Sequence, residues 1–351
     1  MTIVIMISPC AFAQDGSMAN PAPAPAQKAP ASAGDINIPD IIFSHVLDSY
    51  EWHILTWKGH PVAIYLPVIV HSKTTGWHIF SSKHLEEGEY EGFFLAPSGE
   101  KYENKVVERG ENGALVRPLD LSITKNVLSL MIGSLLLLII VLLTARWYKK
   151  HDALNEAPSG IAAVMEPIIM MVHNIAKENI GEDYKKYSPY LLMAFCFIFL
   201  NNLLGIVPIF PGGANLTGNI ACTMVLALLT FFITNVNGTK HYYKEMFNPD
   251  VPVFLKPIMP VIEVFSAIMK PVSLTIRLFA NMLAGHIQLS SVVCIIFIMA
   301  KYGAVLFGSM SLISVLFGIF LDVLEILISF IQAYVFTMLS SIYIGIARQK
   351  N

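Results

Sequence analysis

Charged residues are scarce in this chain. Only 14% of its 351 residues are Asp, Glu, Lys or Arg, whereas an ordinary soluble domain has about 25%. The formal net charge is −2 and no basic block occurs, so we expect no nucleic-acid partner. Hydrophobic residues make up 55% of the chain and gather in long runs after residue 126. The sequence therefore predicts a soluble segment followed by a membrane domain.

Cysteine is also scarce, with four in the chain. Cys10 lies near the N-terminus, Cys196, Cys222 and Cys294 lie inside apolar runs, and no pair has the spacing of metal ligands. Six of the ten histidines fall in the first third without matching a zinc motif. They are His45, His53, His60, His71, His78 and His84. We interpret the cysteines as packing residues and the histidines as surface residues, and expect neither a metal site nor a cofactor.

The first residues resemble an export signal. Residues 3–9 are mostly apolar, and Ala11-Phe12-Ala13 has the small-x-small form of a signal-peptidase site, although no basic residue precedes the apolar stretch. We expect residues 1–13 to be a signal peptide, and the alternative is an uncleaved leader. Residues 14–34 are rich in Ala and Pro, cannot form a core, and are typical of an extended linker.

Residues 35–125 form the expected extramembrane segment. Runs with strand-like composition cover His60–Val70, Gly76–Phe80 and Tyr90–Leu95, and Pro97-Ser98-Gly99 predicts a turn. This composition favours a short β-rich or mixed module.

The first membrane span is the uncharged run Val127–Ala145. At about 1.5 Å per residue, roughly 20 such residues cross the hydrocarbon. An aromatic and basic cluster, residues 146–150, follows at once and marks the cytoplasmic end. The segment 35–125 should therefore lie outside, in the periplasm, and residues 126–351 form the membrane domain.

The remaining apolar stretches predict an all-α polytopic protein of about five to six membrane helices. Residues 159–181 read as an amphipathic surface helix, and residues 190–210 and 216–234 as the second and third spans. Four asparagines lie in and near these spans, and they predict interhelical hydrogen bonds or interface residues, with a role in water access as the alternative: Asn201, Asn202, Asn215 and Asn219.

Two longer units follow. Residues 251–300 contain Pro257, Pro260 and Pro271, which predict a kink or break. Residues 302–347 exceed one span, so they either form a hairpin or run as one long tilted helix. The basic tail with Arg348 should be cytoplasmic.

Ionisable residues inside apolar helices are costly and usually functional. Arg277 and Asn281 are four residues apart and share a helix face, with small residues nearby, whereas His286 points about half a turn away. From spacing alone, Arg277 either lies deep in the bilayer or snorkels to the cytoplasmic interface beside Lys270.

A second polar group follows one helical stripe with steps of 3, 4 and 3. It consists of Asp322, Glu325, Ser329 and Gln332, and ends where Phe336 takes the next position. Such a stripe predicts a water path or an interhelical polar seam, and Gln332 needs a hydrogen-bond partner. Glu325 is either a channel carboxylate or a helix-end residue.

Two motifs resemble a known family. The stretch Pro271–Met282, PVSLTIRLFANM, closely resembles the signature of subunit a of the F-type ATP synthase. The block Leu324–Ala347 is similar to the family's last helix, and IQAYVF at 331–336 resembles the segment with its conserved amide. The resemblance covers roughly residues 120–347 and implies a bacterial member with an extra N-terminal exterior segment.

The resemblance implies a stator proton-channel subunit beside a rotor ring of carboxylate-bearing helices. The family's essential arginine corresponds to Arg277, and Asn281 and Gln332 match polar positions near it. Glu263 matches a carboxylate of the cytoplasmic access path. His286 and Glu325 match a pair on the outer path, in the reverse order of some members, which implies neighbouring side chains and leaves open which one relays the proton.

The implied subunit is not itself catalytic but translocates protons, and it has no cofactor. Its implied partners are the rotor c-ring, the peripheral stalk subunit b, other ATP synthase subunits and the lipid bilayer. It would lie in the bacterial inner membrane with a cytoplasmic C-terminus. The rival function is a secondary ion-coupled transporter, which would need inverted repeats or a substrate pocket, and the sequence contains no internal repeat.

Overall fold

The computed structural model describes most of the chain after residue 47. The described ranges are 48–57, 60–86, 88–97, 102–110, 114–151, 156–207, 212–248, 252, 256, 258–300 and 304–349. The expected signal peptide, the linker and His45 lie outside them. The chain divides into two units, of which one holds residues 1–128, 208–210 and 287–321 and the other holds residues 129–207, 211–286 and 322–351.

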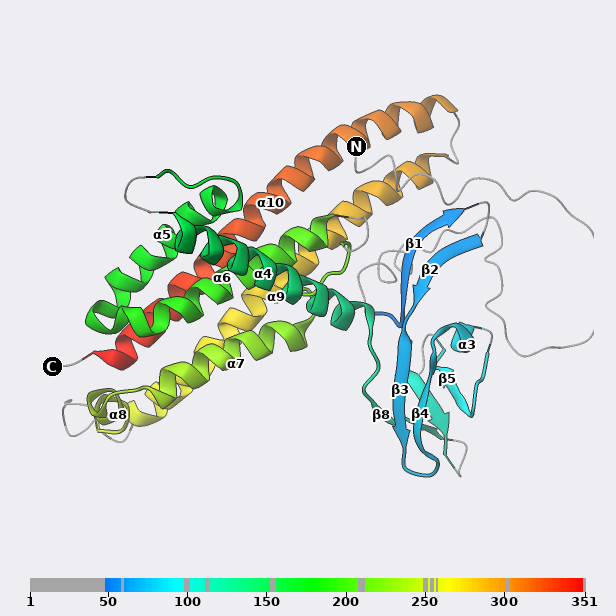
Figure 1. Cartoon of the computed structure of the whole chain (residues 1–351). Helices are drawn as coiled ribbons and strands as arrows, with labels where there is room; N and C mark the ends of the chain where they lie inside the picture. Colours follow the sequence, from blue (N-terminus) through cyan, green and yellow to red (C-terminus); the bar gives the residue numbers. More distant parts are fainter. Residues whose placement is uncertain are drawn as a thin grey trace, which may run out of the picture. The chain divides into compact units, whose positions relative to one another are not determined.

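The N-terminal module of the first unit is built from short antiparallel strands (Figure 1). The hairpin β1 (Glu51–Trp57) and β2 (His60–Tyr65) stands beside two three-stranded sheets of order β4-β3-β8 and β5-β6-β7. Their bounds are β3 Pro67–Ser72, β4 Gly76–Ser81, β5 Phe93–Leu95, β6 Val106–Arg109, β7 Leu115–Val116 and β8 Leu119–Asp120, with the short helix α3 at Lys83–Glu86. The expected strand at 60–70 is thus two strands, and the one at 90–95 begins at Phe93.

The module has its own core, because alternate residues of β3 turn inward. Val68 and Val70 are fully buried and pack in one cluster with Phe80, Phe93 and other apolar residues.

The buried Tyr50 hydroxyl also holds the module together. It donates a hydrogen bond of 2.5 Å to Asp120 Oδ2. Burial, and then the nearby Asp120 carboxylate, raise the pKa of Tyr50 above its ordinary value. The hydroxyl therefore remains protonated and keeps joining the two ends of the module.

The rest of the chain is helical (Figure 1). The bounds are α4 Lys125–Lys150, α5 Ile161–Ile180, the 3-10 turn η1 Gly181–Asp183, α6 Tyr184–Ile206, α7 Ile220–Val236, α8 Lys240–Phe247, α9 Met259–Ala300 and α10 Ala304–Arg348. Among the described residues four segments are long and apolar enough to cross a membrane, or five if α7 and α8, bent by 101°, count as one span. The prediction of an all-α polytopic membrane protein is confirmed.

The two longest helices differ from one expectation. α9 is one continuous helix of 42 residues, so of the predicted kink or break the break is wrong, whereas a kink stays a prediction. Pro260 lies in its first turn, where no intrahelical donor is required, and only Pro271 interrupts the hydrogen bonding within the helix. α10 is a single helix of 45 residues, so residues 304–347 form one long helix and not the alternative hairpin.

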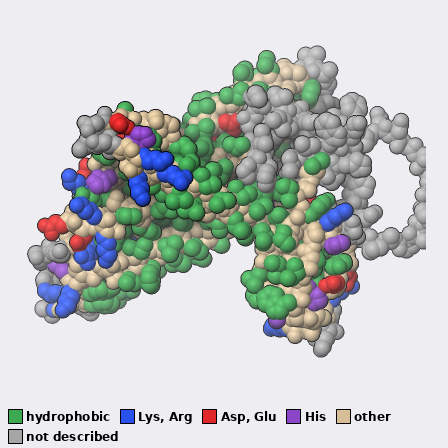
Figure 2. Space-filling model, in the orientation of Figure 1, with side chains coloured by type: hydrophobic (Ala, Val, Ile, Leu, Met, Phe, Trp, Pro, Cys, Tyr) green, Lys and Arg blue, Asp and Glu red, His purple; other side chains and the backbone are tan. Residues whose placement is uncertain are grey.

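One hydrophobic core joins six helices of the second unit. It contains Leu137 of α4, Val172 of α5, Phe195 of α6, Ala227 of α7, Leu278 of α9 and Phe336 of α10 among others. Outside this core, apolar side chains cover the helices, while Lys and Arg gather at the end that carries α8 and the C-terminus of α10 (Figure 2). An apolar surface with one basic end is typical of a protein in lipid.

Candidate functional site

Arg277 lies in the middle of α9 and its side chain is exposed on the surface of the described chain. At 1.5 Å per residue it is about 27 Å from Met259 and about 34 Å from Ala300. The opposite face of the helix packs inward, because Leu274, Leu278 and Met282 are buried. The guanidinium therefore lies on the face of α9 that points away from the helix core, far from both ends of the helix.

Asn281 and Gln332 connect α9 to α10. The Asn281 Nδ2 donates to Gln332 Oε1 over 2.7 Å. Gln332 is buried, so this bond satisfies the amide for which the sequence predicted a partner. The bond lies one turn beyond Arg277 and fixes the two helices in register at that depth.

His286 and Glu325 meet between the same helices. The distance from His286 Nε2 to Glu325 Oε1 is 3.8 Å, and Glu325 is only 5% exposed. Two glycines permit this approach: a Cβ on Gly285 would lie 2.9 Å from the Glu325 Oε1, and one on Gly205 of α6 would lie 3.5 Å from His286 Nε2. The structure thus brings together the two side chains that the resemblance pairs.

Further buried polar groups lie near this pair. Ser329 of α10 is one turn from Glu325, and Asn202 of α6 is one turn from Gly205. The Thr217 hydroxyl donates to Asn202 Oδ1 over 2.6 Å. Ser329 Oγ, Asn202 Nδ2 and Asn215 Nδ2 have no hydrogen-bond partner among the described residues. Each such atom costs about 1–3 kcal/mol unless water or another chain pairs with it, which favours a hydrated route.

A groove of about 800 Å³ opens where α8, α9 and α10 meet. Its charged lining comes from Lys240, His241, Lys244, Glu245, Glu263 and Lys270. Glu263 lies about 21 Å before Arg277 along α9. The sequence singled out Glu263 but missed the opposite wall, because α8 approaches α9 only through the 101° bend after α7.

A smaller cavity of about 10 Å³ shares Tyr242 and Lys270 with this groove and reaches Thr230 and Leu274. This volume is close to what one water needs. The Lys270 ammonium stands 5.4 Å from the centre of the Tyr343 ring, between the two cavities. The groove is therefore followed, toward the middle of α9, by a small and mostly apolar cavity.

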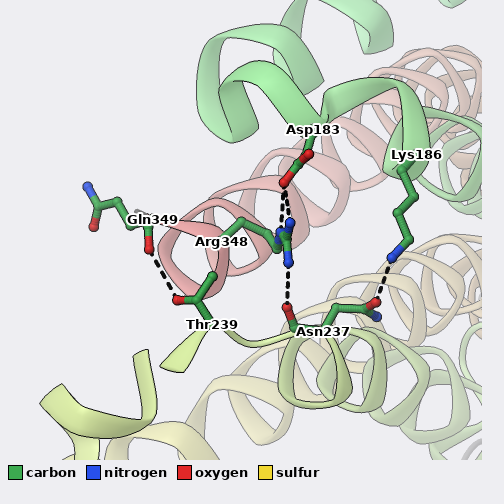
Figure 3. A network of polar contacts seen from close by, with 6 residues as sticks. All are labelled: Asp183, Lys186, Asn237, Thr239, Arg348 and Gln349. Atoms are coloured by element: carbon green, nitrogen blue, oxygen red, sulfur yellow. Dashed lines mark hydrogen bonds and ion pairs between the residues drawn. The ribbon is translucent and has the colours of Figure 1, made fainter. Parts of the chain in front are cut away.

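Six residues join the basic ends of several helices (Figure 3). The Arg348 Nε donates to Asp183 Oδ2 over 2.9 Å, and another Arg348 nitrogen donates to the Asn237 carbonyl over 3.3 Å. Lys186 donates to Asn237 Oδ1, and the Thr239 hydroxyl to the Gln349 carbonyl. This network fixes the end of α10 to η1 and to the turn between α7 and α8. Sequence reasoning recognised Arg348 only as part of a basic tail.

The histidines of the described part of the module do not form a metal site. Among the described residues, no three His, Cys, Asp or Glu side chains are grouped so that they could hold an ion. His78 instead contacts the Glu91 carboxylate over 2.6 Å and the Thr75 hydroxyl over 2.8 Å.

Comparison with known families places most of the chain. Residues 128–345 match the family described as ATP synthase A chain. Residues 41–121 match a separate family described as a domain of unknown function, DUF8433.

Several curated proteins are similar over the membrane domain. The chain is 44% identical to ATP synthase subunit a of Chlorobium phaeobacteroides strain BS1, over 65% of this chain and 66% of that protein. It is 42% identical to ATP synthase subunit a of Pelodictyon phaeoclathratiforme, over 73% and 72%. It is 38% identical to ATP synthase subunit a of Myxococcus xanthus, over 69% and 79%. The chain thus spans about two thirds of the length of the first two relatives.

Proposed function

This chain belongs to the family of ATP synthase A chains, and we propose that Arg277 is the fixed positive charge with which it works as the stator proton-channel subunit. It is a multi-pass membrane protein whose partners are other ATP synthase subunits. Nothing in the sequence or the fold favours the alternative of a secondary transporter.

One observation supports this role for Arg277 above the others: its side chain is exposed on a membrane helix. A guanidinium keeps its charge at any physiological pH, and a charge inside lipid costs several kcal/mol unless it is paired. A partner that offers a carboxylate at this depth removes that cost. The rotor ring, whose helices each carry one carboxylate, is the partner that fits.

The outer half-channel runs to His286 and Glu325. Buried polar groups of α6 and α10 around the pair support a hydrated path, since unpaired amide and hydroxyl groups bind water. Histidine exchanges protons near neutral pH, which suits a relay. Protons reaching the pair neutralise a rotor carboxylate, which then enters the lipid at low cost.

The inner half-channel starts at the groove beside Glu263. Its basic lining from α8 and α9 attracts the negative charge left when a rotor carboxylate releases its proton. Arg277 stands between the two half-channels along α9, about 14 Å from His286 and about 21 Å from Glu263. It favours the ionised rotor carboxylate and prevents a proton from passing straight between the channels.

Rotation is driven by the membrane potential. Each charge that crosses 100 mV releases about 2.3 kcal/mol. Because Arg277 prevents a proton from passing directly between the two half-channels, the proton has to travel on a rotor carboxylate as the ring turns. Asn281 and Gln332, joined next to Arg277, position the two helices around it.

The arrangement in the membrane is also part of the proposal. The rotor ring covers the face of α9 that carries Arg277, and subunit b is the contact to the peripheral stalk. Residues 35–125 lie in the periplasm of a bacterial inner membrane, and the C-terminus lies in the cytoplasm, where the basic end of the helices belongs.

The test is Arg277→Ala in the assembled enzyme in membrane vesicles. Proton-driven ATP synthesis should fall below detection because the fixed charge is gone. Arg277→Lys retains a charge without the planar fork and should recover little activity. Ile276→Ala is a matched control, since Ile276 is an exposed neighbour on the same helix, and should synthesise ATP at nearly the original rate. Wild-type synthesis by Arg277→Ala in intact, assembled complexes would refute the role.

A further inference from the structure

One face of the β4-β3-β8 sheet carries large apolar side chains. The register places Trp77, His71 and Leu119 in one row across the three strands, and Ile79 and Ile69 in the next. Leu121 joins that second row, because its N–H donates to the Ile69 carbonyl. These six residues form what we call the apolar sheet face. Within the described part of the chain, Trp77 is 59%, Ile79 72%, Leu119 58% and Leu121 56% exposed.

The module's own core does not need this face. Val68, Val70 and Phe80 of the same sheet turn to the other side and are buried there. Figure 2 shows apolar side chains gathered over β8 and its neighbouring strands. A contiguous apolar surface of this kind on a small module marks a contact with another apolar phase.

The face is attached directly to the start of the first membrane helix. The backbone N–H of Lys125, the first residue of α4, donates to the Ser49 carbonyl over 2.9 Å. The N–H of Asn126 donates to Asp48 Oδ1 over 3.1 Å. The N–H of Ile123 donates to the carbonyl of Pro67, the first residue of β3, over 3.2 Å. Both ends of the module and the central strand of the sheet are therefore fixed to the end of α4.

These attachments limit the distance from the lipid. Leu121 precedes Lys125 by four residues, so at most about 14 Å of chain separates them. Val127, in the first turn of α4, is itself exposed. The sheet face is therefore held within about 14 Å of chain of the residue at which α4 begins, which keeps it near the headgroup layer of about 5–8 Å that borders the hydrocarbon.

We propose that the apolar sheet face lies in the lipid interface of the leaflet at which α4 begins. The proposal goes beyond the proton path and does not depend on it. A face whose exposed residues are mostly large apolar side chains, joined to the start of a membrane helix, suits a bilayer surface. Tryptophan favours the headgroup level, where its ring is in apolar surroundings and its N–H reaches water. His71 packs edge-on against the Trp77 ring at 4.8 Å, which keeps a second amphipathic ring in the same row.

The test uses spin labels on the full chain in the assembled enzyme, reconstituted in liposomes of phosphatidylethanolamine and phosphatidylglycerol. The four native cysteines are first replaced by alanine. Labels attached after Ile79→Cys or Leu121→Cys should be relaxed several-fold more by oxygen, which concentrates in lipid, than by a water-soluble nickel chelate. Both side chains are exposed, so substitution there leaves the core intact.

Two matched positions calibrate the result. A label after Lys73→Cys, exposed in the turn between β3 and β4, should respond mainly to the nickel chelate. A label after Leu135→Cys, exposed on α4, should respond mainly to oxygen. If the labels at 79 and 121 behave like the one at 73, the face is in water and the proposal is wrong. If they are shielded from both reagents, another protein segment or subunit covers the face, and the proposal is equally wrong.

Discussion

At the scale of single residues, the contact between His286 and Glu325 leads to a prediction that could not be made from their order in the sequence alone. The two side chains come within 3.8 Å from different helices, so their positions can be exchanged. We predict that His286→Glu or Glu325→His alone slows proton flux by roughly 10²-fold, the lower end of what a positioned proton relay contributes. The double exchange should recover most of that loss, because it restores one acid and one imidazole at the same spacing.

Proton pumping driven by ATP in inverted vesicles measures this effect. Ser291→Ala serves as a control, since this residue follows on α9 and its hydroxyl donates to the Ile287 carbonyl of its own helix. A double variant as slow as either single one contradicts a relay shared between the two positions. It would instead assign the relay to one residue in its present place.

Two kinds of sequence information predicted part of the candidate site: the residues that share a helix face, and the family motif around Arg277. Steps of three and four residues placed Glu325, Ser329 and Gln332 on one stripe, and all three are buried. The partner of Gln332 was not predictable from spacing, because Asn281 is 51 residues away. The role of Arg277 also depends on its exposure, which only the packing of Leu274 and Leu278 reveals.

At the scale of helices, close contacts through glycine decide where α10 lies. A Cβ on Gly345 would stand 2.1 Å from the Asn179 carbonyl oxygen of α5, which is backbone and cannot rotate away. We predict that Gly345→Ala separates α5 from α10 and costs about 1–3 kcal/mol, as overpacking usually does. The thermal transition of the purified complex in detergent should fall accordingly.

Gly308 offers the matched control on the same helix. Among the described residues, no atom lies within 4 Å of a Cβ at this position. Gly308→Ala should therefore leave stability unchanged, or raise it by about 0.5–1 kcal/mol through better helix propensity. Equal transitions for the two variants would contradict the close contact of α5 and α10.

The continuity of α9 shows where local rules fail. Proline in a helix interior costs about 3 kcal/mol, so Pro271, with Pro257 and Pro260, predicted a kink or a break. In lipid a broken backbone would leave further polar groups unpaired, which costs more than one distorted turn. By contrast, the bounds of α4 were predicted closely, because they depend on its own uncharged run and on the basic cluster that follows it.

At the scale of the whole molecule, the network around Arg348 constrains how often the chain crosses the membrane. It brings Asp183 before α6, Asn237 after α7 and Arg348 at the end of α10 to one place (Figure 3). An even number of crossings must therefore separate these points. The pairs α6 with α7 and α9 with α10 satisfy this condition. If α4 adds one further crossing, we expect the N-terminal module and the C-terminus on opposite sides of the membrane.

We therefore predict opposite labelling of two exposed lysine positions. Lys73→Cys, in the module, should react with a membrane-impermeant maleimide only from the periplasmic side. Lys244→Cys, in α8 beside the groove, should react only from the cytoplasmic side, because the groove is the inner entrance. Right-side-out and inverted vesicles with the native cysteines replaced separate the two cases. Reaction of both from the periplasmic side would place the groove at the outer entrance and reverse the direction assigned to Glu263 and His286. Reaction of both from the cytoplasmic side would contradict the periplasmic position of the module.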